Sequence, residues 1–235
     1  MSPLGIWRLT ILFPALFLTG CYSLAYRDEA RSLLKADKIL VVLHPNANRP
    51  DMPFSVGERH AISQVDDQVS TEGRRVMDAY GIVDPLNGVA NNFLQALPSE
   101  IIQGTVVYKD KCCFDPFELD GWVQFQTLTW ELVGWRGEGE AAEYYLNYWV
   151  QAKIFHNSGK RHRKTGAVFM ETLWGGNCEI IQIAEFPLPY DRHSKGHTLS
   201  TWLENNASLL KESLTSLEKT CGEKLARDLL TFLQP

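Results

Sequence analysis

The chain has 235 residues, of which 45% are hydrophobic and 22% are charged, with 17 glycines and 11 prolines. This composition is typical of a globular domain and argues against a disordered stalk. The formal net charge is −5 at pH 7 and no long basic run occurs, so we expect no nucleic-acid partner.

The first twenty residues differ in composition from the rest of the chain. Arg8 precedes a stretch of apolar and small residues, 9–18, which is shorter than the roughly 20 residues that a membrane span requires. A positive residue, a short apolar stretch and small residues at its end are typical of a secretory signal peptide. Residues 18–21 read Leu-Thr-Gly-Cys and resemble the lipobox of bacterial lipoproteins.

The lipobox resemblance implies that a signal peptide, residues 1–20, is removed and that Cys21 receives a diacylglyceryl group and a further acyl chain such as palmitate. Two or more acyl chains hold a protein firmly on a membrane, whereas a single chain binds only marginally. Tyr22, and not an aspartate, follows the cysteine. In a host with two membranes, this favours the outer membrane, on the side that faces the periplasm. The alternative is an ordinary signal peptide or an uncleaved anchor with a chance cysteine.

After the lipobox we expect a tether with a short helix over residues 21–36 and a single globular domain over residues 37–235. Residues 38–44 are a compact apolar run, which predicts a buried strand. Residues 45–80 are polar and interrupted by prolines, and only a short helix over residues 65–79 is predicted there.

A third helix is predicted over residues 85–97. Asp84 provides a cap, Pro85 suits the first helical position, and Pro98 ends the helix. The apolar residues recur at helical spacing and form one stripe: Leu86, Val89, Ala90, Phe93, Leu94 and Leu97.

From Ile101 the apolar pattern alternates with a period of two, which is typical of strands. In the longest such segment, Tyr148 and the even-numbered residues share one face, and Trp149 and the odd-numbered residues share the other. Turn residues at 157–159 and 165–166 indicate that the last two strands form a hairpin. The predicted strands are residues 101–108, 122–133, 143–156 and 167–174.

The chain closes with a predicted long helix over residues 199–233 that one break could interrupt. Its apolar residues alternate at spacings of four and three, which places Cys221 on the buried stripe. Because Cys178 directly follows the hairpin, we predict a disulfide between Cys178 and Cys221, as suits an oxidising compartment. The adjacent Cys112 and Cys113 are expected to be free thiols, or one of them to be bonded elsewhere.

No catalytic or metal-binding motif stands out, so we expect no catalytic residue, no metal site and no cofactor. His193 and His197 are four residues apart, but Gly196 and Pro189 favour a solvated loop over a metal site. Three carboxylates close in sequence lie among turn residues and are expected to be solvated: Asp115, Glu118 and Asp120.

Two further features offer binding chemistry. Residues 160–164, Lys-Arg-His-Arg-Lys, form a basic cluster at the predicted hairpin tip. Such a cluster is usually a soluble turn, and contact with anionic lipid headgroups is the alternative. Aromatic residues in the strands are expected to be core, with a platform for a glycan or peptide as the alternative: Trp122, Trp130, Trp135, Tyr145 and Trp149.

The whole pattern resembles a group of small envelope lipoproteins that includes ABC-transport auxiliary lipoproteins and domains similar to the TolB amino-terminal domain. The resemblance rests on the order β–α–β–β–β–α, on residues 127–132 (Thr-Leu-Thr-Trp-Glu-Leu), and on Trp174, Cys178 and Cys221. It covers roughly residues 37–230 and departs at residues 45–80. It implies a binding or assembly role in the cell envelope and no catalytic residue.

We therefore expect an α/β domain of the α+β type, in which a mainly antiparallel sheet carries an early strand–helix unit and a long C-terminal helix packed on it. The expected function is that of a non-enzymatic lipoprotein that docks onto an envelope protein partner. The alternatives are an envelope hydrolase that uses His193 or His197, and a binder of lipid or glycan.

Overall fold

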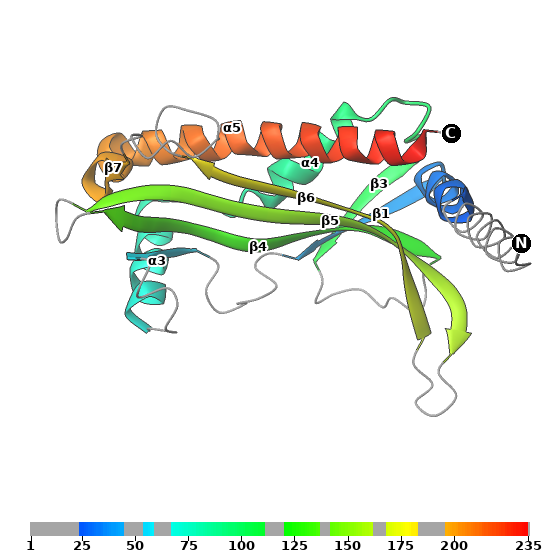
Figure 1. Cartoon of the computed structure of the whole chain (residues 1–235), viewed down its shortest axis with the longest axis horizontal. Coiled ribbons are helices and arrows are strands. Elements are labelled where there is room, and N and C mark those ends of the chain that lie inside the picture. The colour runs from blue at the N-terminus through cyan, green and yellow to red at the C-terminus, as the bar shows by residue number, and fades with distance from the viewer. Residues whose placement is uncertain are drawn as a thin grey trace, which may run out of the picture.

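The structure is a computed structural model that describes residues 24–44, 54–58, 67–110, 120–136, 142–161, 168–182 and 196–234. Within these residues the strands form one mixed sheet, and α4 and α5 lie on one of its faces (Figure 1). The expected class, α+β with a long C-terminal helix packed on a mainly antiparallel sheet, is confirmed. In chain order the elements are an N-terminal helix (24–34), β1 (Lys38–His44), β2 (Ser55–Glu58), α3 (Asp67–Tyr80), α4 (Leu86–Ala96), β3 (Thr105–Asp110), β4 (Gly121–Arg136), β5 (Glu143–Arg161), β6 (Val168–Gln182), β7 (His197–Thr198) and α5 (Leu199–Leu233).

The sheet has an antiparallel half and a parallel half. β4, β5 and β6 are long, consecutive in the chain and paired antiparallel, and β7 adds to β5 in the same sense. β1 lies between β3 and β4 and is parallel to both, while β2 is parallel to β4. Parallel neighbours need longer connections than a hairpin, and α3 and α4 lie between β2 and β3 in the chain.

The C-terminal helix lies along the sheet with α4 beside it (Figure 1). Its bounds agree with the prediction, and its buried residues follow the predicted stripe through Leu210, Leu214 and Leu217. Residues Glu204–Ala207 have non-helical backbone angles, so the helix is broken once near its start. Asn205 and Asn206 have positive φ there, a conformation that asparagine tolerates better than most side chains.

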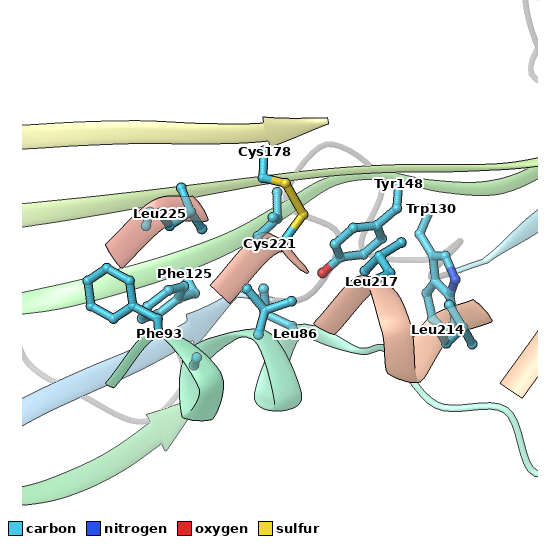
Figure 2. Packing of buried hydrophobic residues seen from close by; sticks show 14 of the residues in the cluster. Leu86, Phe93, Phe125, Trp130, Tyr148, Cys178, Leu214, Leu217, Cys221 and Leu225 are labelled. Carbon is cyan, nitrogen blue, oxygen red and sulfur yellow. A yellow bond between two sulfur atoms is a disulfide. The ribbon is translucent and has the colours of Figure 1, made fainter. Parts of the chain in front are cut away.

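Figure 2 shows the core between α4, α5 and the sheet. Phe93 of α4 packs edge-on against Phe125 of β4, with 5.2 Å between their ring centroids. The predicted disulfide is present: Cys178 of β6 and Cys221 of α5 are bonded, with their Cα atoms 5.5 Å apart, and both are buried. The covalent link therefore fixes the hairpin to the last helix.

β6 runs on to Gln182, well beyond the end predicted at residue 174. The sequence Gly175-Gly176-Asn177 has the composition of a turn, but the structure requires glycine at 176 for packing. A Cβ on Gly176 would lie 2.7 Å from the Trp174 ring and 3.1 Å from Leu225 of α5. The glycine therefore lets the helix approach the strand, and the strand continues.

Residues 157–159, predicted as a turn, lie within β5 where the pairing with β6 shifts register. The N–H of Gly159 donates to Asn157 Oδ1 at 3.0 Å, and Gly159 has a φ of 67°. These residues form an irregularity inside the hairpin, and the hairpin itself is confirmed by the pairing of β5 with β6.

The N-terminal helix is packed against the domain. Ala30 and Leu34 are completely buried in the main core. Glu29 Oε1 lies 2.9 Å from His156 Nε2 of β5, and the Arg31 guanidinium donates to the carbonyl oxygen of Leu233 at the end of α5. The folded domain therefore includes residues 24–36, most of the segment that the sequence suggested as a tether.

Candidate binding surface

The strands β4, β5 and β6 present a polar face on the side of the sheet opposite to α5. Side chains alternate along a strand, so the burial of Tyr148 and Val150 in the core under α5 places Trp149 on the other side. Trp149 is 38% exposed, and its cross-strand neighbours are Thr129 and Glu179. We name this surface the Trp149 face; it comprises Gln126, Thr129, Glu131, Asn147, Trp149, Gln151, Asn177 and Glu179.

Two hydrogen-bonded pairs flank Trp149 along β5. Asn147 Nδ2 donates to Glu131 Oε1 at 2.7 Å, and Gln151 Nε2 donates to Asn177 Oδ1 at 2.9 Å. Both pairs join residues that lie opposite each other on neighbouring strands. Residues two apart along a strand are separated by about 7 Å. The indole therefore stands between two ordered polar groups, one on each side.

The other aromatic residues of the predicted platform do not join Trp149 on this face as exposed rings. Trp130 points into the core, where its ring centroid lies 4.8 Å from that of Phe54. Trp122 is buried in a second, smaller cluster and stacks on Phe155 at 5.1 Å. Tyr145 is also buried, and the side chain of Trp135 lies outside the described part of the chain. The expected core role holds for these three buried rings, and Trp149 is the exception.

A cavity of about 480 Å³ opens between the N-terminal helix and the start of β4. Ile39, Trp122 and Ile154 contribute to its apolar wall. Charged groups of both signs also line it beside the His156 imidazole, so its electrostatics favour no one class of ligand: Glu29, Lys38, Lys109 and Asp120. Asp120 is the one member of the predicted carboxylate cluster that the structure describes, and it is exposed here.

A separate polar group lies at the start of α4, where Asp84 is half-buried and its neighbours Thr127 and Tyr148 are fully buried. Asp84 accepts hydrogen bonds from the Leu86 N–H at 2.8 Å, as the predicted helix cap requires, and from Thr127 Oγ1 at 3.1 Å. Burial raises the pKa of Asp84 to about 6, although both hydrogen bonds lower it in part. The Tyr148 hydroxyl lies 3.4 Å from Thr127 Oγ1, and burial raises the pKa of Tyr148 well above its usual value. Thr127 and Tyr148 have no exposed surface, so this group joins α4 to the sheet inside the core.

Several predicted site residues lie outside the described part of the chain: Cys21, Cys112, Cys113, Asp115, Glu118, residues 162–164 and His193. His197 begins β7 and packs edge-on against Trp202, with 5.5 Å between ring centroids. No group of three or more His, Cys, Asp or Glu residues that could hold a metal ion occurs in the described ranges. None of the helices described there is long and apolar enough to cross a membrane.

No protein-family model and no curated protein matches this chain. Among solved structures, a Xanthomonas campestris protein assigned to the family DUF330 aligns at a TM-score of 0.39 with 13% identity, over 82% of this chain and 85% of that one. A neuraminyllactose-binding hemagglutinin homolog from Helicobacter pylori aligns at a TM-score of 0.20 with 8% identity, over 83% of this chain and 91% of that one. At these TM-scores neither likeness establishes a shared fold or function.

Proposed function

We propose that this chain is a lipid-anchored protein of the cell envelope that acts as a binding or assembly accessory and catalyses no reaction. Acyl chains on Cys21 hold it on a membrane outside the cytoplasm; in a host with two membranes, this is the outer membrane, facing the periplasm. The observation that carries the binding role is the Trp149 face, where an exposed indole stands between two hydrogen-bonded polar pairs.

The exposure of Trp149 supports recognition because a large ring at this position is unfavourable in water. Tyr145 and Tyr148, its neighbours on β5, are 6% and 0% exposed, whereas Trp149 is 38% exposed. Apolar area gains about 25 cal/mol per Å² when it leaves water, so a partner that covers the ring gains this free energy. Tryptophan is also enriched among the residues that dominate binding energy.

The placement of the titratable groups supports binding over catalysis. The raised pKa of Asp84 is the kind of shift that a general acid or base shows, and its cause is burial. Its neighbours Thr127 and Tyr148 are completely buried, so none of their atoms meets a substrate. His197, one of the two histidines that the hydrolase alternative would use, contacts Trp202, and His193 lies outside the described residues.

The proposal is tested by cosedimentation of the purified protein with isolated cell envelopes. The mature chain, residues 21–235, is used with Cys21→Ser, which removes the lipid and keeps every described residue. We expect saturable binding and a loss of affinity of about tenfold or more in Trp149→Ala. Phe169→Ala is the matched control, because Phe169 is an exposed aromatic residue of the same hairpin that lies outside the Trp149 face.

The control variant should bind like the unsubstituted protein. Far-UV circular dichroism and melting temperatures must be equal in both variants, so that a loss of binding is not a loss of fold. Equal binding by Trp149→Ala and Phe169→Ala at matched folding would overturn the proposal that this face is the recognition surface.

A further inference from the structure

We infer that the ligand of the Trp149 face is a neutral glycan built of pyranose sugars, an inference that rests on the binding role proposed for this face. It follows from three properties of the face: one accessible indole, ordered amide and carboxylate partners beside it, and a charge that is negative close to the ring.

The first property is the match between an indole and a sugar ring. A pyranose has a side formed by C–H groups, which packs on a flat aromatic face, and a rim of hydroxyls that donate and accept hydrogen bonds. Trp149 provides the aromatic surface, and its 38% exposure leaves the ring accessible. The large apolar ring of tryptophan gains free energy when a sugar covers one of its faces, even though the other groups around the ring are polar.

The second property is the ordered polar rim. An amide has two N–H donors and a carbonyl acceptor, and a side-chain pair uses one donor and one acceptor. Gln151 and Asn177 therefore retain donors and acceptors for hydroxyls while the pairs hold their orientation, whereas Asn147 retains only its second Nδ2 hydrogen, because its Oδ1 is buried. Side chains that are already ordered lose little conformational freedom on binding, which favours affinity for a polar ligand.

The spacing of the pairs indicates an oligosaccharide in place of a single sugar. One pair stands about 7 Å to each side of Trp149 along β5. A single sugar stacked on the indole is too short to reach both polar pairs. In a longer glycan, the sugars on either side can contact Asn147 in one direction and Gln151 in the other. Affinity is therefore expected to rise with the length of the glycan.

The charge of the face indicates a neutral glycan. Glu179 lies directly across from Trp149, and Glu131 lies across from Asn147. The nearest cation along β5 is Lys153, which lies across from Gly175 and beyond Gln151. Lys224 of α5 donates to the Asn177 carbonyl oxygen at 2.6 Å, and its charge is paired with Asp228 at 3.0 Å. Carboxylates accept hydrogen bonds from hydroxyls, whereas they repel the carboxylates of acidic sugars.

A protein ligand fits this face less well. The centres of protein interfaces are depleted of charged residues and contain clusters of apolar and aromatic anchors. Every other residue that defines the Trp149 face is polar or charged, and the apolar Ile181 occupies the register position across from Asn147 at its edge. A protein partner would have to bury these groups around a single ring, while a glycan matches them with hydroxyls.

The first experiment measures binding of defined oligosaccharides to the mature Cys21→Ser chain by calorimetry and tryptophan fluorescence. The probes are oligomers of N-acetylglucosamine and of glucose, one to six sugars long, and uronic-acid oligomers of the same lengths. We expect a neutral series to bind with affinity that rises with length, and the uronic-acid series to bind at least about tenfold more weakly.

Three variants and one control then locate the site. Trp149→Ala should lose about tenfold or more in affinity, and Trp149→Phe should lose less because a smaller ring remains. Trp149→Phe should also abolish the fluorescence change on binding, which assigns that signal to this side chain. Gln151→Ala should weaken longer oligomers more than short ones, while Phe169→Ala should bind as the unsubstituted chain does.

The second experiment separates the glycan from a protein ligand in the envelope itself. Isolated envelopes are treated with periodate, which cleaves sugar diols, or with protease, and are washed before cosedimentation. If binding is lost after periodate treatment and retained after protease treatment, the inference is supported. Binding that still requires Trp149 but is destroyed by protease alone identifies a protein ligand: it overturns the glycan and leaves the binding role intact. Binding that does not require Trp149 overturns both.

Discussion

At the scale of single residues, Asp84 connects three elements through one carboxylate. It accepts hydrogen bonds from the start of α4 and from Thr127 of β4, and Thr127 lies close to the hydroxyl of Tyr148 on β5. Burial raises the pKa of Asp84 to about 6 from 3.8. The folded chain therefore binds a proton at this site more tightly than the unfolded chain does.

This pKa shift predicts a pH dependence of stability. Because the folded value lies above the unfolded value, the contribution of Asp84 is full below about pH 4 and is lost as the pH rises through about 6. Asp84→Asn cannot ionise and keeps an oxygen acceptor for the Leu86 N–H. We expect this variant to exceed the natural chain in unfolding free energy at pH 8, by at most about 3 kcal/mol, and to lose the advantage near pH 4.

Urea denaturation of both proteins at pH 8 and pH 4.5 provides the measurement. Asp78→Asn, at an exposed position on α3, is the control for removal of one negative charge. A difference between Asp84→Asn and the natural chain that is the same at both pH values would contradict the assignment.

The outward direction of Trp149 was only half predictable from the sequence. The alternation of β5 shows that Tyr148 and Trp149 lie on opposite faces, but both faces carry aromatic residues, so the pattern does not say which face is covered. Coverage depends on distant segments. For example, a Cβ on Gly196 would lie 3.0 Å from the Tyr145 ring, because the chain before β7 passes over that residue.

The polar pairs were missed because they depend on register. The pairing of β4 with β5 shifts between Thr127 and Thr129. Thr127 is buried in the core, and Trp130 is buried beyond the shift, so the inward-facing positions change from odd to even numbers. Thr129 and Glu131 consequently face outward with Trp149. A bulge of this kind reverses the faces of a strand and leaves little trace in the hydrophobic pattern.

At the scale of elements, the segments with a clear apolar pattern and clear ends were predicted well, whereas the end of β6 and the short strand β2 were not. The bounds of β1 and α5 agree with the prediction, since each has a clear apolar pattern and a clear start. β2 has four residues, too few for a period to appear, and it was not predicted. β2 forms because it pairs with β4, and such a tertiary contact cannot be predicted from the strand propensities of its residues alone.

The packing of α5 against α4 gives a prediction for Gly222. A Cβ there would lie 2.5 Å from Asn92 Cβ, 2.7 Å from the Phe93 nitrogen and 2.8 Å from the Val89 oxygen. Two of these atoms are backbone and cannot rotate away, so the helices must separate. In a helix, replacing glycine by alanine raises the free energy of unfolding by up to about 1 kcal/mol. Overpacking in a core lowers it by about 1–3 kcal/mol.

We therefore expect Gly222→Ala to lower the free energy of unfolding by about 1–2 kcal/mol, against the trend of helix propensity. Ser216→Ala, at an exposed position of the same helix, should change it by less than about 0.5 kcal/mol. Thermal and urea denaturation under non-reducing conditions measure both, with the Cys178–Cys221 disulfide intact. A Gly222→Ala protein as stable as the natural chain would show that the two helices are not in close contact.

At the scale of the whole molecule, the described chain begins and ends at the same end of the fold. The N-terminal helix and the last turn of α5 lie together, joined by the hydrogen bond from Arg31 to the Leu233 carbonyl (Figure 1). The described helix starts at residue 24, three residues after Cys21. Three extended residues reach about 10 Å. If Cys21 is lipidated as proposed, this end of the fold is held against the membrane.

The far end of α5 then points away from the membrane. The helical segment after the break, residues 208–233, has a length of about 40 Å at 1.5 Å per residue. Ser32 and Glu204 are both exposed. Ser32 belongs to the N-terminal helix, beside the last turn of α5, and Glu204 lies at the break near the start of α5, so the two positions are at opposite ends of this helical segment. A fluorophore at each position therefore reports how the anchored protein is oriented.

We predict efficient energy transfer from position 32 to an acceptor on lipid headgroups and weak transfer from position 204, measured on the lipidated protein in vesicles. Cys21→Ala should abolish membrane association and transfer from both positions, because it removes the acylated thiol. A Gly/Ser insertion of about 20 residues after Tyr22, with a root-mean-square length of about 25 Å, should reduce the difference between the two positions by letting the domain leave the surface and rotate. Equal transfer from both positions without the insertion would contradict the short tether, whereas membrane association of Cys21→Ala equal to that of the natural chain would contradict the lipid anchor itself.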